Sequence, residues 1–89
     1  MNNLRITSFN KKYKADFEKL NREWIEEFFQ MEDEDFHTLQ NPESYVIQKN
    51  GEIFFAINDQ IVIGTAAMIP FSEDVFELAK MSVKKGFQG

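Results

Sequence analysis

The sequence contains no cysteine, only one histidine, and no apolar run of the length that crosses a membrane. Without cysteine, a disulfide framework and a thiolate zinc site are both excluded. No segment approaches the ~20 apolar residues that a transmembrane helix needs. The first residues lack a basic segment followed by an apolar one, so we expect no signal peptide and no membrane contact. We therefore expect a cytoplasmic protein.

Basic residues are also few. Ten Lys and Arg stand against fifteen Asp and Glu, which gives a net charge of −5 and a pI near 4.8. Phosphate backbones need a basic face, so we expect no nucleic-acid partner. Apolar residues make up 43% of the chain and include ten phenylalanines, which is ample for a hydrophobic core. A chain of 89 residues predicts one small domain over 1–89.

The first half of the chain predicts a strand followed by two helices. Apolar and polar residues alternate over residues 4–9, which indicates a short strand. From Tyr13 the apolar residues recur at helical spacing, which predicts a helix to about residue 28 that packs on a sheet. Its apolar stripe consists of Phe17, Leu20, Trp24 and Phe28, with Ile25 alongside. A second helix is predicted from about residue 31 to Asn41, because Pro42 pushes Asn41 out of the helical region.

The second helix opens with the four adjacent acidic residues 32–35. Adjacent carboxylates at a helix start point in different directions and suit the positive end of the helix dipole. A metal site is the competing interpretation, but the run lacks the ligand spacing of a calcium loop. We therefore interpret the run as a solvated helix start and expect no metal. We also expect His37 and Lys80 to reach solvent rather than to take part in chemistry.

The second half predicts an antiparallel meander of three strands. A short extended piece over residues 45–49 precedes a turn at Asn50–Gly51. Strands follow over 53–57 and 61–69, and Gly64 in the second of them indicates a bulge or a close approach by another group. Together with the first half, these elements predict an α+β fold in the order β-α-α-β-β-β.

The last strand is predicted over Val75–Val83, after a loop over 70–74. Alternation places Glu77, Ala79 and Met81 on one face of it, with Val75 and Val83. Phe76, Leu78, Lys80 and Ser82 fall on the other face. Because apolar residues lie on both faces, we expect this strand to be largely buried, or buried on one face and half-covered on the other.

The segment Phe-Glu-Leu-Ala-Lys-Met-Ser-Val at 76–83 is followed a few residues later by Gln88 and Gly89. This arrangement resembles the GNAT superfamily of acyl-CoA N-acyltransferases. There the long central strand leads into a loop of the form Gln/Arg-x-x-Gly-x-Gly/Ala, whose backbone N–H groups hold the pyrophosphate of acetyl-CoA. The order of the upstream elements also resembles that family. The resemblance implies a partial GNAT fold, namely the N-terminal half, ending inside the pyrophosphate loop.

By this resemblance, acetyl-CoA is the cosubstrate and a small-molecule or peptide amine is the acceptor. The central strand would bind the cofactor through Met81, Ser82 and Val83, with the Met81 N–H donating to the thioester carbonyl. Gln88 and Gly89 would begin the pyrophosphate cradle. The connection between the two helices would help to wall the acceptor site, where an acidic rim suits a cationic amine.

Glu77 is the candidate catalytic residue, because some members of the family carry a carboxylate there that draws the amine proton through water. The competing interpretation is a solvated residue at the end of a strand. Both interpretations stay open at this point.

Two functions from different classes follow. In the first, the chain is a truncated N-terminal portion of an N-acetyltransferase, inactive alone because the rest of the glycine loop and the helix after it are missing. In the second, the chain is a non-catalytic fragment that self-associates, as a homodimer, through the exposed edge of its last strand.

Overall fold

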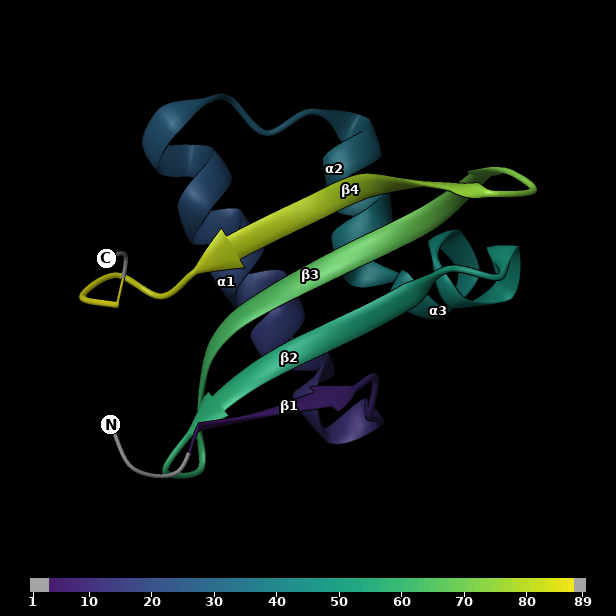
Figure 1. Ribbon diagram of the computed structural model, residues 1–89. Helices are drawn as coiled ribbons and strands as arrows, with labels where there is room; N and C mark the ends of the chain where they lie inside the picture. The colour runs from purple at the N-terminus through teal and green to yellow at the C-terminus, as the bar shows by residue number, and fades with distance from the viewer. Residues whose placement is uncertain (1–3, 88–89) are drawn as a thin grey trace.

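The structure is a computed structural model that describes residues 4–87. It consists of one antiparallel sheet with its helices packed on one face (Figure 1). The elements are β1 (Leu4–Ser8), a 3-10 turn (Lys11–Tyr13), α1 (Lys14–Phe28), α2 (Asp33–Gln40), α3 (Pro42–Tyr45), a second 3-10 turn (Ile47–Lys49), β2 (Glu52–Asn58), β3 (Ile61–Ser72) and β4 (Val75–Val83). The predicted α+β class and the β-α-α-β-β-β order are confirmed, with α3 as a short addition.

The strands lie in the order β1-β2-β3-β4, and each pair of neighbours is antiparallel. β4 therefore forms one edge of the sheet. The register shifts between β2 and β3 next to Gly64, where the sequence predicts an irregularity. In β4, Lys80 pairs with Ala67 whereas Leu78 pairs with Met68, so Ala79 is an extra residue and forms a β-bulge. Because of this bulge, the side chains in the first half of β4 point to the opposite faces from those that a regular strand would give them.

The core lies between the sheet and α1. Phe55 of β2 is fully buried, and its ring contacts the ring of Tyr13 at a centroid distance of 5.3 Å. From α1, Phe17 and Leu20 are buried against the sheet, as the apolar stripe predicts. The C-terminal part of the stripe is less covered, and Phe28 is 54% exposed because α1 ends there. Other buried core residues are Leu39, Val46, Ile53, Ile57, Val62 and Ala67.

The opposite face of the sheet is apolar but bare. No helix of residues 4–87 covers it (Figure 1). Ile6 of β1 is 64% exposed there and Met81 of β4 is 55% exposed. Between them lie the small residues Ala56, Gly64 and Ala66. A sheet that is apolar on both faces is expected to be covered on both.

Two local predictions in the second half are wrong. Residues 45–49 form the end of α3 and a 3-10 turn rather than an extended piece. Pro42, at the first turn of α3, restarts the helix just after Asn41 instead of only ending the previous one. Residues 70–72, predicted as loop, are the end of β3, so the β3–β4 connection is a short turn at Glu73 and Asp74. Pro70 is tolerated next to an irregularity in the pairing of β3 with β4.

The prediction that the last strand is buried is also wrong. Residues 75–78 are exposed, and Ser82 is the one fully buried residue of β4. The physical reason is that β4 is the edge strand, with one face of the sheet open. The predicted alternation fails as well: with the bulge at Ala79, Glu77 lies on the face that carries the helices, whereas Met81 lies on the bare face.

Two glycines give a test of the packing. A Cβ at Gly51 would lie 2.6 Å from the Met68 carbonyl oxygen and 2.7 Å from that of Val46, both of them backbone atoms. A Cβ at Gly64 would be 3.5 Å from the Ser82 oxygen, an ordinary contact. We expect Gly51→Ala to lower the free energy of unfolding by about 2 kcal/mol and Gly64→Ala to change it by less than about 1 kcal/mol. Urea denaturation measures both; equal losses would contradict the packing described.

Candidate functional site

A hollow of about 390 Å³ lies between α1, the start of α2 and the middle of β4. One part of its wall is apolar and aromatic, and the other part is charged. The apolar part comes from α1, the connection after it and β4; the charged part comes from the start of α2 and from the bulge. The lining residues are Asn21, Trp24, Ile25, Phe29, Gln30, Glu32, Asp35, Ala79, Lys80 and Met81.

An ion pair closes one side of this hollow. Lys80 Nζ donates to Asp35 Oδ1 at 2.9 Å, and the two side chains are only 19% and 21% exposed. The second oxygen of Asp35 accepts the backbone N–H of Glu32 at 3.0 Å, and the Glu32 side chain caps α2 in return. Asp35 therefore holds the start of α2 and the middle of β4 together. The expectation that Lys80 reaches solvent is wrong.

The pKa of Asp35 is lowered by this arrangement. Partial burial alone would raise the pKa, since it disfavours the carboxylate. The hydrogen bond from Lys80, the Glu32 N–H and the charge of Lys80 outweigh burial and lower the pKa below its ordinary value. Asp35 thus stays ionised, and the ion pair stays formed, into the acidic range.

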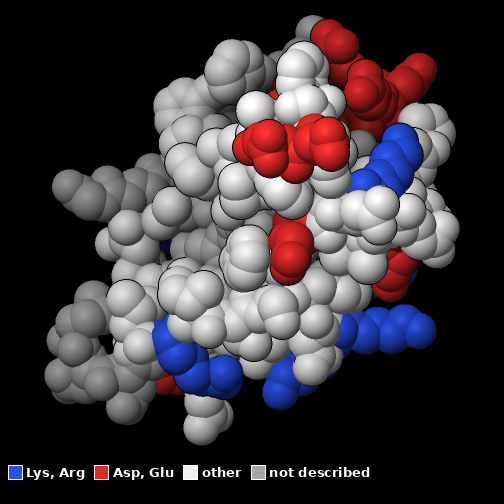
Figure 2. All heavy atoms as spheres, turned by 45° about the vertical axis from the view of Figure 1, so that its right-hand side comes forward, with Lys and Arg blue, Asp and Glu red and all other residues white. Residues whose placement is uncertain are grey.

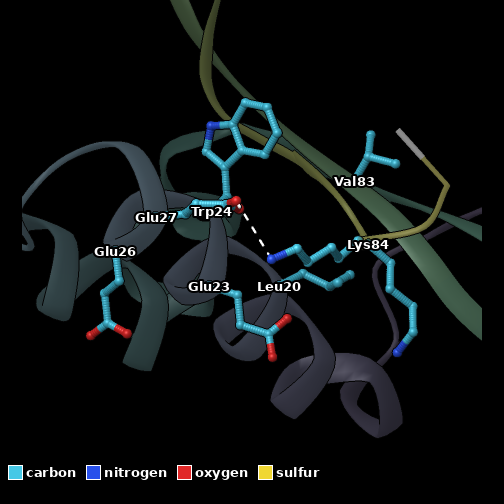
Figure 3. A pocket seen from close by; sticks show the side chains of 8 residues that line it. Leu20, Glu23, Trp24, Glu26, Glu27, Val83 and Lys84 are labelled. Carbon is cyan, nitrogen blue, oxygen red and sulfur yellow. Dashed lines mark ion pairs between the residues drawn. The ribbon is translucent and has the colours of Figure 1, made fainter. Parts of the chain in front are cut away.

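A second hollow, of about 550 Å³, also has Trp24 in its wall (Figure 3). The C-terminal half of α1 lines it with Glu23, Glu26 and Glu27, and the chain after β4 lines it with Lys84 and Lys85. Lys85 and Glu27 form an ion pair of 3.7 Å across it, although the Lys85 side chain is 83% exposed. Such an exposed pair contributes little to stability. Trp24 is the residue that the two hollows share.

The main chain of β4 presents donors at the edge of the sheet. Beyond the strand, the Lys84 N–H donates to the Ile63 carbonyl at 2.7 Å. In an antiparallel ladder these bonds recur at every second residue, so Ser82 also turns its N–H toward β3. Met81 and Val83 then direct their N–H groups away from β3. Met81 thus offers a backbone donor at the edge beside the hollow with Trp24 and Lys80.

The other predicted site residues are placed as follows. Ser82 is buried, and its hydroxyl makes no hydrogen bond within residues 4–87. Val83 lines the hollow in Figure 3. Glu77 is exposed and lines neither of these two hollows. Gln88 and Gly89 lie outside the described residues.

The sequence interpretation missed the Lys80–Asp35 ion pair and the aromatic wall from Trp24 and Phe29. The acidic run was interpreted as a helix start, which the capping by Glu32 confirms. The run gave no sign that Asp35 would face a strand 45 residues away. His37 is exposed, and its ring stacks on that of Tyr45. Within residues 4–87, no group of three or more carboxylate or imidazole side chains could hold a metal ion, and no helix is long and apolar enough to cross a membrane.

Comparison with known proteins decides what kind of fold this is. No model of a protein family matches the chain, and no curated protein matches it. Among solved structures, a GNAT-family acetyltransferase from Staphylococcus aureus Mu50 superposes with a TM-score of 0.81 at 24% identity over 98% of this chain. The chain has a partial GNAT fold. An acetyltransferase from Streptococcus agalactiae 2603 superposes with a TM-score of 0.76 at 18% identity over the whole chain.

The GNAT fold is matched only in part. The chain spans 56% and 57% of the lengths of these two neighbours, and the elements present are those of the N-terminal half. A third neighbour, a GNAT-family acetyltransferase from Elizabethkingia anophelis, was solved with acetyl-CoA bound. It superposes with a TM-score of 0.53 at 17% identity over the whole chain, which spans 49% of its length. At these identities the likeness shows the fold.

The Asp35 pair gives a prediction about pH. Since the pKa of Asp35 is lower in the folded state, its contribution to stability is present above the unfolded pKa and is lost as the pH falls through the folded pKa. We expect Asp35→Asn to lower the free energy of unfolding by about 1 kcal/mol at pH 7 and to flatten the loss of stability below pH 4. Chemical denaturation from pH 7 to pH 3 measures both effects.

The matched control is Glu43→Gln. Glu43 pairs with Lys14 at 3.0 Å, but this pair is more exposed and joins α3 to the start of α1, away from the hollow. We expect a loss of only a few tenths of a kcal/mol from it. A larger loss for Glu43→Gln than for Asp35→Asn would contradict the role assigned to Asp35.

Proposed function

We propose that this chain forms the acceptor-binding half of a GNAT-type N-acetyltransferase, which transfers the acetyl group of acetyl-CoA to an amine. One observation carries the proposal: in a partial GNAT fold, β4 directs a backbone donor at Met81 outward beside a hollow with carboxylates in its wall. The rest of the domain, which the neighbours possess and this chain does not span, would supply the remainder of the cofactor site.

The transfer needs only a few groups. The nitrogen of a neutral amine attacks the thioester carbonyl carbon, the C–N bond forms, the C–S bond breaks, and sulfur leaves as the thiolate of CoA. Negative charge builds on the carbonyl oxygen, and a backbone donor such as the Met81 N–H stabilises it. The main-chain N–H of Val83 also points away from β3, so Val83 would contact the pantetheine arm. Ser82 turns its N–H toward β3, so of the three predicted contacts it is the most indirect.

One proton of the amine must pass to a base. Glu77 remains the predicted base. Its partner across the sheet is Ile69, which packs against the core, so Glu77 lies on the face that carries the helices. From there a chain of water molecules would connect it with the hollow beside Lys80. In this proposal Gln88 and Gly89 begin the pyrophosphate cradle.

Binding of acetyl-CoA at the edge of β4 tests the proposal. In an amide NMR titration of the chain, we expect acetyl-CoA to shift the signals of Met81 and Val83, while β1, at the opposite edge of the sheet, serves as the internal control. Shifts confined to β1, or none at all, would refute the proposal.

A proline substitution sharpens this test. Met81→Pro removes an outward N–H and keeps the ladder, since proline is tolerated on an edge strand where the N–H faces away. We expect about tenfold weaker binding, as for the loss of one good hydrogen bond, with the circular dichroism of the parent. Ser82→Pro removes a ladder bond instead and is expected to destabilise the fold.

The second candidate function is self-association, and the bare face of the sheet favours it. The exposed apolar residues Ile6, Leu78 and Met81 lie on that face, and Ile6 and Met81 line a shallow apolar hollow of about 220 Å³. Figure 2 shows uncharged surface between the charged side chains: most acidic ones lie in the upper part of the view, one lies at the centre, and the basic ones lie along the right and lower parts. Exposed apolar residues that gather on one face, as Ile6, Leu78 and Met81 do, mark an interaction site. Two copies of the chain could cover it, and the antiparallel edge of β4 could pair with its own copy.

Mass measurement at rising concentration tests this candidate. If two copies associate through the bare face, light scattering should give a dimer for the parent chain and a monomer for Ile6→Asp, because a charge would be buried in the interface. Phe28→Asp is the matched control, since Phe28 is similarly exposed but lies on the helical side. A monomer for the parent chain at high concentration would rule the candidate out.

A further inference from the structure

The hollow between α1 and β4 combines two kinds of wall that suit one kind of ligand. Trp24 and Phe29 provide aromatic surface, and Ile25 adds apolar surface. The charged groups that line it are the carboxylates of Glu32 and Asp35 and the ammonium group of Lys80. The wall as a whole therefore carries one net negative charge.

The three charged groups are not equivalent. Asp35 uses one oxygen for Lys80 and the other for the Glu32 N–H, so both of its oxygens are already hydrogen-bonded. Glu32 caps α2 with its side chain but pairs with no Lys or Arg within residues 4–87. A carboxylate has about four lone-pair positions, so Glu32 can still accept a hydrogen bond from a ligand ammonium group. Because Glu32 is the carboxylate of this hollow that lacks a cationic partner among the described residues, the hollow suits a ligand with one positive charge.

We propose that the acceptor bound in this hollow is a monocationic amine with an aromatic or other flat apolar body, and that Lys80 disfavours polyamines. This inference rests on the proposed function. The ammonium group binds at Glu32, and the body lies against Trp24 and Phe29, where a cation also gains from the ring faces. A second positive charge on the ligand meets the Lys80 ammonium in a partly dehydrated wall, which weakens the binding of polyamines.

The amine enters as an ammonium ion and loses its proton before attack, as the transfer requires. Lys80 is thus a specificity-determining residue and not a catalytic one. Its pairing with Asp35 holds it at the bulge of β4, so that its charge has a fixed place in the wall. Because the expected selectivity depends on the number of positive charges on the ligand, it can be measured with simple amines.

Trp24 is the only tryptophan of the chain, so its fluorescence reports binding directly. The chain is titrated with 2-phenylethylamine, spermidine and 3-phenylpropionate. We expect 2-phenylethylamine to change the Trp24 emission at the lowest concentration, spermidine to bind at least about fivefold more weakly, and the anion to bind weakest. The inference is overturned if 2-phenylethylamine does not change the emission of Trp24. It is also overturned if spermidine binds as tightly as 2-phenylethylamine.

Because Trp24 also lines the hollow of Figure 3, matched variants in the two hollows locate the ligand. We expect Glu32→Gln to weaken 2-phenylethylamine about three- to fivefold, the effect of one partly exposed ion pair. The glutamine oxygen can still cap α2, so the fold is kept. Glu23→Gln, in the other hollow, should change the affinity by less than about 1.5-fold, the low end for such a pair. The reverse result overturns the inference.

Lys80→Met tests the selectivity itself. We expect it to strengthen spermidine relative to 2-phenylethylamine about three- to fivefold, since a like charge is removed. Lys85→Met, which removes a charge from the other hollow, should leave the ratio unchanged. An unchanged ratio in Lys80→Met overturns the role of Lys80. If Lys80→Met does not fold, the same titrations at pH 7 with Lys80→Gln decide.

These results are separable from those of the proposed function. Amine selectivity can fail while acetyl-CoA still shifts the amide signals of β4, and then only the inference falls. If amines bind as expected but acetyl-CoA does not bind, the transferase proposal falls, and the hollow is an amine-binding site without transfer.

Discussion

The bulge at Ala79 is the constraint on which the candidate site depends. An antiparallel strand presents alternate residues to opposite faces, and one extra residue reverses this order on one side of it. Beyond the bulge, Lys80 and Ser82 face the helices and Met81 faces outward; before it, Glu77 faces the helices and Leu78 the bare face. The charged side chains of β4 are thereby collected on the side of α1 and α2, and its apolar ones on the open side.

The Lys80–Asp35 ion pair forms because the bulge turns the Lys80 side chain toward the helices. A buried or half-buried ion pair adds little stability by itself, but it specifies which two elements of the fold contact each other. Here it joins the edge strand to the capped start of α2, so the connection between α1 and α2 is held over the middle of β4. The hollow with Trp24 and Phe29 lies between α1, the start of α2 and the middle of β4. In the proposed function the ion pair therefore shapes the acceptor side, while the main chain at Met81 serves the acetyl donor.

The two proposed functions use different faces of the same sheet. Acetyl transfer uses the helical side and self-association uses the bare apolar face, and both proposals also use the edge of β4. The neighbours of the same fold are nearly twice as long as this chain. Apolar residues on a second sheet face are what a further layer of structure requires, whether it comes from a longer polypeptide or from another copy.

The partial GNAT fold was implied by a resemblance to a known family. The sequence alone determined the order of the elements, the antiparallel meander, and the buried face of α1 at Phe17 and Leu20. These features follow from periodicity, turn residues and local motifs, which act over a few positions. Only the tertiary structure decided that residues 75–78 of β4 are exposed, that Ala79 forms a bulge, and that Lys80 meets Asp35. A bulge depends on the pairing of β4 with β3, and an ion pair across 45 positions depends on how a helix crosses a sheet. Neither leaves a periodic trace in the chain, because each arises from contacts between segments far apart in the sequence.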